Sequence, residues 1–314
     1  MKISLFHEPW WLSAATGDKF QEAVVKRGDE VTGRLPYITK RRGPFNIVRM
    51  PPFTHMLGPV VDAGEGKHQT RLMRRLSITR SLIDQLPPNF FFHQHLDPSI
   101  DDGLALADGL AFQERKFGVS AQYTFEIDCR QSLDEMWAAM YLKTRQHTRR
   151  AEKAYSVRTV EDPQHFISFY LNNLETRGLN NRIDFSNFPA LFGECQSRSC
   201  AHILGAFDHD NSPVAMTFVA WGHGTMYYLL STRSSKSHDL GSNSLLLWSA
   251  MKRANELKLV LDLDGVYSSG TSRFLNNFGG KIKTRLTIHR TRMPYTALQF
   301  LKRSYAEDES QFFT

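Results

Sequence analysis

Apolar and polar residues follow two kinds of spacing along the chain, and each predicts a type of secondary structure. The stretches 20–27 and 30–38 flank Gly28-Asp29, which favours a tight turn, and together they predict a β-hairpin. Between 67 and 86 the apolar residues recur at roughly helical spacing, which predicts a helix. Pro87-Pro88 ends that helix, because proline has no backbone N–H with which to continue it.

The second half of the chain contains short apolar stretches separated by polar turns. The stretches 201–207, 214–221 and 226–231 predict three consecutive strands of a meander. A helix over 242–257 and a strand over 259–263 are predicted to follow. This half is therefore expected to combine a sheet with a covering helix.

One order of elements occurs twice: helix, apolar strand, short helix, Phe-Gly pair and long alternating strand. The copies span 67–128 and 242–290, and we interpret them as two diverged copies of one α/β unit. Between them, Ser132 and Glu135 form a capping-box pattern that predicts a long helix with a cationic second half. The sequence therefore predicts an α/β (α+β) fold with two tandem domains, whose central sheets are mixed and mostly antiparallel. The predicted boundaries are 1–130 for an N-terminal domain, 131–156 for the basic linking helix and 157–314 for a C-terminal domain.

Composition and charge narrow the class of protein. Hydrophobic residues make up 41% of the chain and aromatic residues 12%, which indicates a globular protein with a substantial core. The net charge of +7 suits an anionic partner, either a phosphorylated cofactor or a nucleic acid. Three cysteines, an odd number, argue against a disulfide framework and fit a reducing compartment. No apolar run approaches the ~20 residues that span a bilayer, so we expect a cytoplasmic protein.

The polar loop before the helix 242–257 has the composition of a phosphate-binding segment. Small residues allow backbone N–H groups to approach a phosphate, and the start of a helix favours negative charge. The alternative is an ordinary helix start, capped by Ser242 or Asn243 and without a ligand. The candidate cofactor-binding residues are Ser237, Leu240, Gly241, Ser242 and Asn243.

Two carboxylates follow one another at the end of the strand 259–263. Asp262 and Asp264 are two positions apart, so in a regular strand both side chains point to one face. Close like charges raise one pKa, which is how such a pair supplies a general base. The alternative is turn chemistry, because Asp264-Gly265 is a common turn dipeptide.

The predicted basic helix carries Arg145, Arg149 and Lys153 four positions apart, on one face. This face either holds a phosphorylated ligand or is solvated. Two short motifs have a spacing seen among metal ligands: His93-Gln94-His95 with Asp97, and Cys195 and Cys200 with His202. Neither has a second ligand pair at convincing spacing, so we expect no metal.

The C-terminal half resembles the acyltransferases of the GNAT fold, in the branch of the Fem-type peptidoglycan aminoacyl transferases and the CelD-like acetyltransferases of polysaccharide biosynthesis. The motifs that carry the resemblance are the basic segment 143–153, the stretch 240–248, Asp262-Leu263-Asp264-Gly265 and the segment from Arg273-Phe274 to Gly280. Members of these groups commonly have two GNAT-like halves, which agrees with the repeated order of elements.

The resemblance implies transfer of an acyl group to an amine or hydroxyl, with acyl-CoA or aminoacyl-tRNA as the donor. GNAT enzymes bind the CoA pyrophosphate at the place of 237–242, where Ser237, Leu240 and Ser242 replace the usual Arg or Gln, Gly, and Gly or Ala. Fem-type enzymes often have a Lys after the Phe that matches Phe274, and this chain has Leu275. The donor therefore stays open between the two.

Three functions follow from these features. The first is an acyl-CoA-dependent acyltransferase acting on a peptidoglycan or polysaccharide precursor of the envelope, or on a small metabolite. The second is an aminoacyl-tRNA-dependent ligase, and the third is a non-catalytic ligand-binding protein of the same fold. For an enzyme, we assign Asp264 as the base and Tyr228 as the acid. The candidate substrate-binding residues are Lys143, Arg145, Arg149, Asp262 and Arg273.

Overall fold

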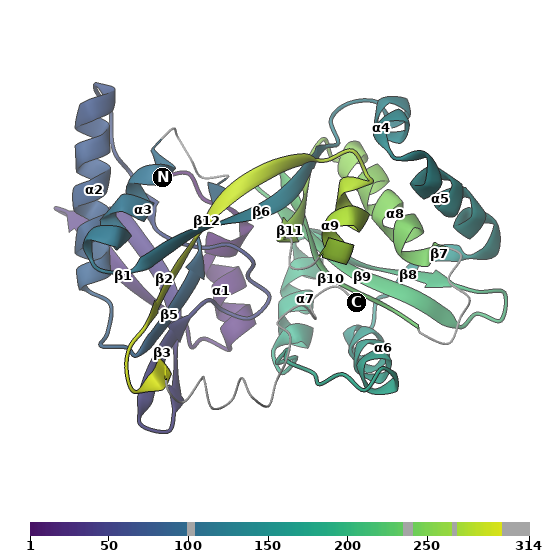
Figure 1. Ribbon diagram of the computed structural model, residues 1–314, viewed down its shortest axis with the longest axis horizontal. Coiled ribbons are helices and arrows are strands. Elements are labelled where there is room, and N and C mark those ends of the chain that lie inside the picture. Colours follow the sequence, from purple (N-terminus) through teal and green to yellow (C-terminus); the bar gives the residue numbers. More distant parts are fainter. Residues whose placement is uncertain (99–103, 235–240, 266–268, 297–314) are drawn as a thin grey trace. The chain divides into compact units, whose positions relative to one another are not determined.

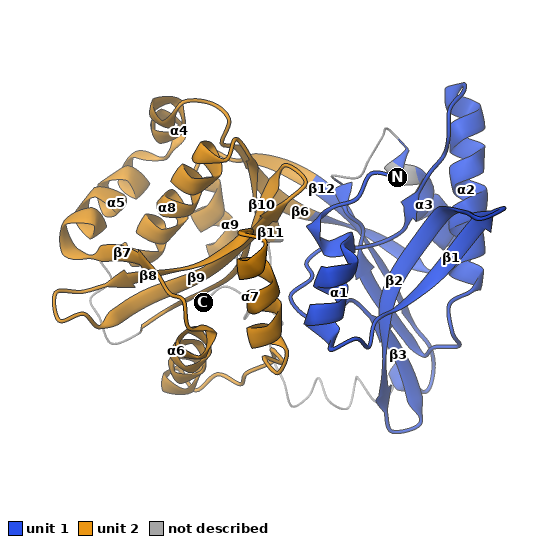
Figure 2. Cartoon of the chain, turned by 180° about the vertical axis from the view of Figure 1, so that it is seen from behind, with its two compact units in different colours: residues 1–122, 284–307 blue, residues 123–283, 308–314 orange. Residues whose placement is uncertain are grey.

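The computed structural model describes residues 1–314 except 99–103, 235–240, 266–268 and 297–314. The chain divides into two compact units, which Figure 2 colours separately. Unit 1 comprises Met1–Gln122 together with the described residues from Thr284 onward, and unit 2 comprises Tyr123–Lys283. Two strands, β6 (Gly118–Asp128) and β12 (Lys281–Thr291), run from one unit into the other.

Unit 1 is built on β1 (Gln21–Arg27), β2 (Glu30–Arg42), β3 (Phe45–Arg49), β4 (Val60–Val61) and β5 (Phe91–His95). Its helical segments are η1 (Leu5–His7), α1 (Pro9–Thr16), α2 (His68–Asp84) and α3 (Ala105–Glu114). The β1–β2 hairpin is confirmed, and Gly28 in its turn has φ +64°. Neighbouring strands run in the order β1-β2-β3-β5-β12, and only β3 and β5 among these form a parallel pair.

The core of unit 1 lies between this sheet and the helices α2 and α3. Leu82 of α2, Phe112 of α3, and Phe92 and Ile288 of β5 and β12 are fully buried together. A buried ion pair joins the two helices, because Asp108 accepts hydrogen bonds from Arg75 at 2.7 Å and from Thr79 at 2.7 Å. The helix predicted over 67–86 is thus confirmed as α2, and its apolar face covers the sheet.

Unit 2 contains β7 (Ser156–Thr159), β8 (Ala201–Phe207), β9 (Pro213–Gly222), β10 (Thr225–Arg233) and β11 (Val260–Gly265). Its helices are α4 (Leu133–Ala139), α5 (Leu142–Ala154), α6 (Pro163–Thr176), α7 (Phe188–Ser197), α8 (Ser242–Glu256) and α9 (Ser269–Asn276). The strand order is β6-β11-β10-β9-β8-β7, with β10 and β11 as the parallel pair. Helices α5 and α8 lie over one face of the meander β8–β10, and α6 and α7 lie over the other (Figure 1). The predicted α/β fold with mixed, mostly antiparallel sheets is confirmed.

The two copies of the repeated unit exchange their last strands. β12, the last described strand of the second copy, pairs with β5 in unit 1 through Thr287–Thr291. β6, the last strand of the first copy, pairs with β11 in unit 2 through Thr124–Asp128. The units therefore differ from the predicted division into 1–130, 131–156 and 157–314, because each needs a strand from the other half of the sequence to complete its sheet.

The basic linking helix predicted over 131–156 is two helices, which belong to unit 2. The capping box is present, since Glu135 N–H donates to Ser132 Oγ and Ser132 N–H donates to Glu135. The helix stops at Met140, whose ψ of 144° is extended. Tyr141 N–H then donates to Asn277 O at 2.8 Å, a contact with the distant end of α9. Within the described part of the chain, no helix is long and apolar enough to cross a bilayer.

Candidate functional site

Strands β10 and β11 pair over only part of their length. Their parallel ladder consists of Thr225 with Val260, Met226 with Leu261, and Tyr227 with Asp262. β10 continues to Arg233 and β11 to Gly265, with no further pair recorded between them among the described residues. The two strands therefore stop pairing with each other after Tyr227 and Asp262, and Asp264 N–H donates to Asp262 Oδ1 at 2.7 Å.

A bulge lies in β10 at this point. The register with β9 shifts between Tyr228, which pairs with Val219, and Leu230, which pairs with Phe218. Leu229 is the additional residue, and such a bulge bends the strand and re-aims the groups beside it. The bulge and the end of the β10–β11 ladder coincide, so the irregular backbone is concentrated at one place in unit 2.

Helix α8 begins after β10 and provides the positive end of a helix dipole. Its N-cap is Gly241, which has φ +104° and no side chain to cap the first N–H groups. A Cβ at this position would lie 2.9 Å from both His147 Cβ and His147 O of α5. Glycine is therefore required twice here, for its backbone angle and for the close approach of α5. Ser242 is buried, Asn243 is half-buried, and the predicted Ser237 and Leu240 lie outside the described residues.

Two polar atoms near the start of α8 and on α5 are enclosed without a partner in the described part of the chain: Nε of Arg145 and Oδ1 of Asn243. Buried polar atoms are nearly always hydrogen-bonded, so an unsatisfied atom in such a place is a mark of a ligand or water position. The predicted Arg145 and Asn243 thus lie on α5 and α8, the two helices that contact each other at Gly241. Lys143 and Arg149 are exposed, and the guanidinium of Arg149 lies 5.3 Å from the centre of the Trp137 ring.

Asp262 is buried and already has hydrogen-bond partners. Its Oδ1 accepts from Thr124 Oγ1 at 2.7 Å and from Asp264 N–H at 2.7 Å. The first bond ties β6 to β11, and the second fixes the backbone of Asp264 near the end of β11. This arrangement gives Asp262 a structural position beside the site. Thr124 was absent from the sequence prediction, because 138 residues separate it from Asp262 and no local pattern signals the pair.

Asp264 has a strained backbone and a buried side chain. Its φ is +63°, the left-handed region that residues other than glycine rarely adopt, and the β11–β6 register shifts between Asp262 and Gly265. The regular alternation that underlies the prediction of two carboxylates on one face therefore ends before Asp264. Such strain persists where the surroundings impose it, and it is concentrated at functional sites.

Tyr228 is fully buried on β10, next to the bulge. Its hydroxyl donates to Ser231 Oγ at 2.9 Å. Burial raises the pKa of the phenol above its ordinary value, and hydrogen bonds with Ser231 and Thr217 oppose that change. The phenol is thus held protonated at neutral pH, as an acid must be. Arg273 is exposed on α9, the helix that follows β11 along the chain.

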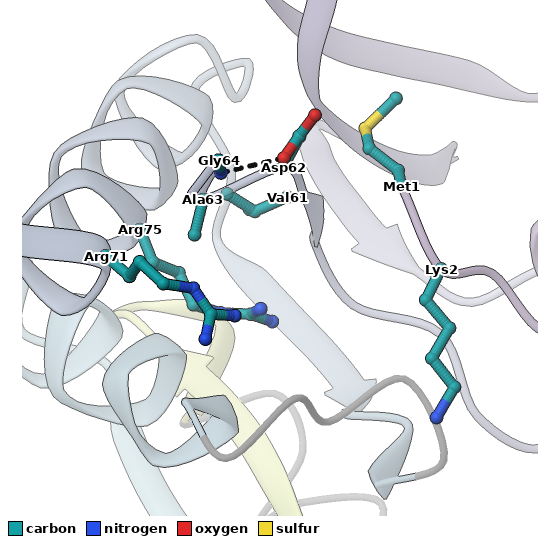
Figure 3. Close-up of a pocket in the computed structure, with 8 residues that line it drawn as sticks. All are labelled: Met1, Lys2, Val61, Asp62, Ala63, Gly64, Arg71 and Arg75. Carbon is teal, nitrogen blue, oxygen red and sulfur yellow. Dashed lines mark hydrogen bonds between the residues drawn. The ribbon is translucent and has the colours of Figure 1, made fainter. Parts of the chain in front are cut away.

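A cavity of about 110 Å³ lies in unit 1 and is distinct from these features of unit 2 (Figure 3). Arg71 and Arg75 of α2 point into it, although Arg75 also holds Asp108. Pockets for small-molecule ligands usually measure ~300–1,000 Å³, so this cavity is too small for an acyl donor. It is lined by Met1, Lys2, Val61, Asp62, Ala63, Gly64, Arg71 and Arg75. Among the residues that the structure describes, no three His, Cys, Asp or Glu side chains gather as metal ligands would.

Several solved structures have folds similar to that of this chain. FemX superposes with a TM-score of 0.68 at 14% identity, and the match covers 94% of each chain. L-PGS from Bacillus licheniformis gives 0.53 at 10% identity, over 93% of this chain and 90% of that one. A tandem GNAT protein from the clavulanic acid biosynthesis pathway gives 0.53 at 12% identity, over 86% and 82%. These likenesses show the fold. The comparison with curated protein sequences finds no match.

The model of the acetyltransferase (GNAT) domain matches residues 110–268. That span is slightly more than half of the 314 residues, and it runs from α3 to the turn after β11. It includes α5, the β10 bulge, the start of α8 and both aspartates. The predicted resemblance is therefore confirmed, and the chain belongs to the GNAT acetyltransferase domain family.

Proposed function

We propose that this protein moves an acyl group from acyl-CoA to an amine or hydroxyl of a small metabolite or of a peptidoglycan or polysaccharide precursor. The observation that carries the proposal is the arrangement around Gly241. β10 and β11 stop pairing after Tyr227 and Asp262, and α8 starts from a glycine that is packed against α5. The end of the β10–β11 ladder and a helix N-terminus in one unit suit a thioester carbonyl and a diphosphate.

The start of α8 is the proposed place of the diphosphate of CoA. The first N–H groups of a helix have no partner within the helix, and the dipole adds positive potential. Arg145 contributes a full charge, and its enclosed Nε has no partner among the described residues. Gly241, Ser242 and Asn243 would supply the backbone donors, as would the predicted Ser237 and Leu240 outside the described range.

The chemical step then needs little more than positioning. A backbone N–H of β10 near the bulge polarises the thioester carbonyl, and the acceptor nitrogen or oxygen attacks its carbon. Asp264 accepts the proton that the nucleophile loses. The carbon–sulfur bond breaks, and Tyr228 returns a proton to the departing thiolate. The burial of Asp264 and the position of Tyr228 next to the bulge in β10 support these two roles.

A second candidate function has its own support. Helix α5 presents Lys143, His147, Arg149, Arg150 and Lys153 to solvent, and none of them forms an ion pair within the described residues. Such a surface fits the phosphates of an aminoacyl-tRNA, the donor of Fem-type enzymes. Binding of this kind weakens steeply as salt increases, because counterions are released from the nucleic acid. Co-purification of tRNA that is lost at high salt would favour the ligase.

A thermal-shift titration tests the first proposal. Acetyl-CoA, longer acyl-CoAs and free CoA are added to the purified protein, with aminoacyl-tRNA in a parallel series. A ligand at ~100 times its Kd stabilises the native state by about 2.7 kcal/mol, which is visible as a higher Tm. A shift with acyl-CoA supports the acyltransferase, and a shift with tRNA alone favours the ligase. A shift with acyl-CoA but no turnover on any amine or hydroxyl acceptor would favour the binding protein. Because acyl-CoA is a cytosolic donor, the cytoplasm is the proposed compartment.

A further inference from the structure

The face of the unit 1 sheet opposite α2 and α3 carries a row of basic side chains from three neighbouring strands, beside the buried Ile38, Ile47 and His95. Arg49 of β3 pairs with His93 of β5, and His93 pairs with His289 of β12. Paired residues point to the same face, with Cβ atoms ~5 Å apart. Phe92 and Ile288, one position away, belong to the core under α2 and α3. Side chains alternate along a strand, so Arg49, His93 and His289 lie on the face opposite that core.

This row is accessible and has positive potential. Arg49 and His289 are exposed, and His93 is half-buried. Neither Arg49 nor His289 forms an ion pair within the described residues. Burial, and then the charges of Arg49, His289 and Arg285, lower the pKa of His93 to about 4. The three charged groups that lower the pKa of His93 are therefore all bases.

A glycine on the next strand fixes one member of the row. A Cβ at Gly118 of β6 would lie 2.3 Å from Nε2 of His289 and 2.7 Å from its Cε1. The imidazole of His289 therefore lies directly over the backbone of β6, in the space that a side chain at position 118 would occupy. His95, one pair further along β5, is engaged with Thr287 Oγ1 at 2.9 Å, which leaves His93 as the half-buried imidazole of the row.

We propose that Arg49, His93 and His289 bind a phosphate or diphosphate group of a ligand. Neighbouring strands are ~4.8 Å apart, so the outer members of the row are separated by about 10 Å. This separation of the outer side chains is wider than one carboxylate group, and it suits the several oxygens of a phosphate or diphosphate. Arginine matches phosphate oxygens in pairs, and an imidazole adds a donor when its proton faces the anion. His93, one member of the histidine motif noted in the sequence, is thus assigned to an anion.

Binding at this row depends on pH with a definite sign. An anion beside His93 favours its protonated form, so the pKa of His93 in the complex is higher than in the free protein. The complex then binds more protons, and affinity rises as pH falls. Among the described residues, Arg49 of β3, His289 and Arg285 of β12 act on the charge of His93, His95 of its own strand contacts its ring, and none of these four carries negative charge.

The test uses the full chain and inorganic pyrophosphate as the probe, followed by isothermal titration calorimetry and by the NMR signals of the histidine rings. We expect saturable binding that shifts the His93 and His289 signals and tightens from pH 8 to pH 6. Arg49→Ala should weaken it by about tenfold or more, the usual effect of losing a charged hydrogen bond. Arg27→Ala, which removes an exposed arginine from β1 of the same unit, is the matched control and should change little.

Three outcomes would overturn the proposal: no saturable binding, equal weakening by Arg27→Ala, or loss of binding in Gly241→Ala with Arg49→Ala unaffected. The last would place the pyrophosphate at the acyl donor site of unit 2 and not at this row. Circular dichroism of each variant, with Arg49→Lys as a second substitution that keeps the charge, separates lost binding from lost folding. Phosphatidylglycerol vesicles distinguish the sources of the phosphate. If the protein sediments with the vesicles and Arg49→Ala abolishes this, the phosphate belongs to a lipid headgroup. If the protein binds pyrophosphate but not the vesicles, the phosphate belongs to a soluble ester.

Discussion

Two aspartates that are neighbours in sequence have different surroundings. Asp262 accepts two hydrogen bonds that hold β6 and the end of β11, whereas Asp264 has a left-handed backbone and is our proposed base. Asp264→Asn should therefore lower kcat by about a hundredfold, the usual range for a lost general base, with little change in Tm. Steady-state kinetics across pH checks this, and an unchanged rate would remove Asp264 from the mechanism.

Asp262→Ala should act on stability. The substitution leaves the Thr124 hydroxyl and the Asp264 N–H without their acceptor in a buried place, which costs about 1–3 kcal/mol. Urea denaturation measures the change in the free energy of unfolding. A variant as stable as the parent would show that these two bonds contribute nothing.

His93 gives the stability of unit 1 a dependence on pH. Its pKa is about 4 in the folded protein, mainly because of burial, and ~6.5 in the unfolded chain. Between these values the unfolded chain binds a proton that the native protein does not. Stability therefore falls as pH decreases from about 6.5 toward 4, by roughly 2 kcal/mol from this group. Unfolding of His93→Gln should lose this part of the pH dependence, and an identical profile would contradict the assignment.

Sequence reasoning at this scale depends on local patterns. Gly241 and the segment Asp262-Leu263-Asp264-Gly265 could each be singled out from a short stretch of sequence. The partner of Asp262 could not, because Thr124 is 138 residues away, and the partner of Gly241 is the backbone of His147 on another helix. Burial of Arg145 Nε also depends on tertiary contacts, since its helix alone has a strongly polar composition.

At the scale of elements, the junction of α5 and α8 is the most constrained part of unit 2. Gly241→Ala must adopt a left-handed φ and also place its Cβ 2.9 Å from His147. We expect lower stability and weaker binding of acyl-CoA, because the start of α8 has to move. Gly224→Ala is the matched control: its φ is +83°, but nothing lies within 4 Å of the added Cβ. Gly224→Ala therefore introduces backbone strain, which costs about 1 kcal/mol, but does not displace α8.

Calorimetry with acetyl-CoA compares the two variants. Equal affinity for acyl-CoA in Gly241→Ala and Gly224→Ala would show that the position of α8 does not matter for the donor.

Helix ends were predicted well where a local signal marks them and poorly elsewhere. Ser132 and Glu135 correctly announced the start of α4. The break after Met140 has no glycine or proline to announce it. It is imposed by Asn277, which accepts the N–H of Tyr141, and by Gly279, where a Cβ would lie 2.8 Å from Ala139 Cβ. Contacts of that range override the helical preference of the segment.

At the scale of the whole molecule, the exchange of β6 and β12 makes each unit depend on both halves of the sequence. Ile288 is fully buried in the core of unit 1, although it lies in the last described strand. Ile288→Ala should destabilise the protein by about 2–5 kcal/mol through the cavity it leaves. Hydrogen exchange should then show lost protection in β5 and α3 of unit 1. Lost protection confined to unit 2 would contradict the exchange of strands β6 and β12 between the units.

Leu261→Ala, at a buried position of β11 in unit 2, is the control. Protection from hydrogen exchange should then be lost in unit 2 and kept in unit 1. The repeat in the sequence indicated two similar units. It could not indicate the exchange, because both long strands have the same alternating pattern and either one satisfies either sheet.

The central claim is that acyl-CoA binds unit 2 at the start of α8, and calorimetric titration of the full chain with acetyl-CoA tests it most directly. The account predicts saturable binding with one site, weakened about tenfold or more when Arg145→Ala removes the enclosed guanidinium. Arg27→Ala on β1 should leave that affinity unchanged. No binding of acetyl-CoA, or binding that Arg145→Ala and Gly241→Ala leave intact, would contradict the account.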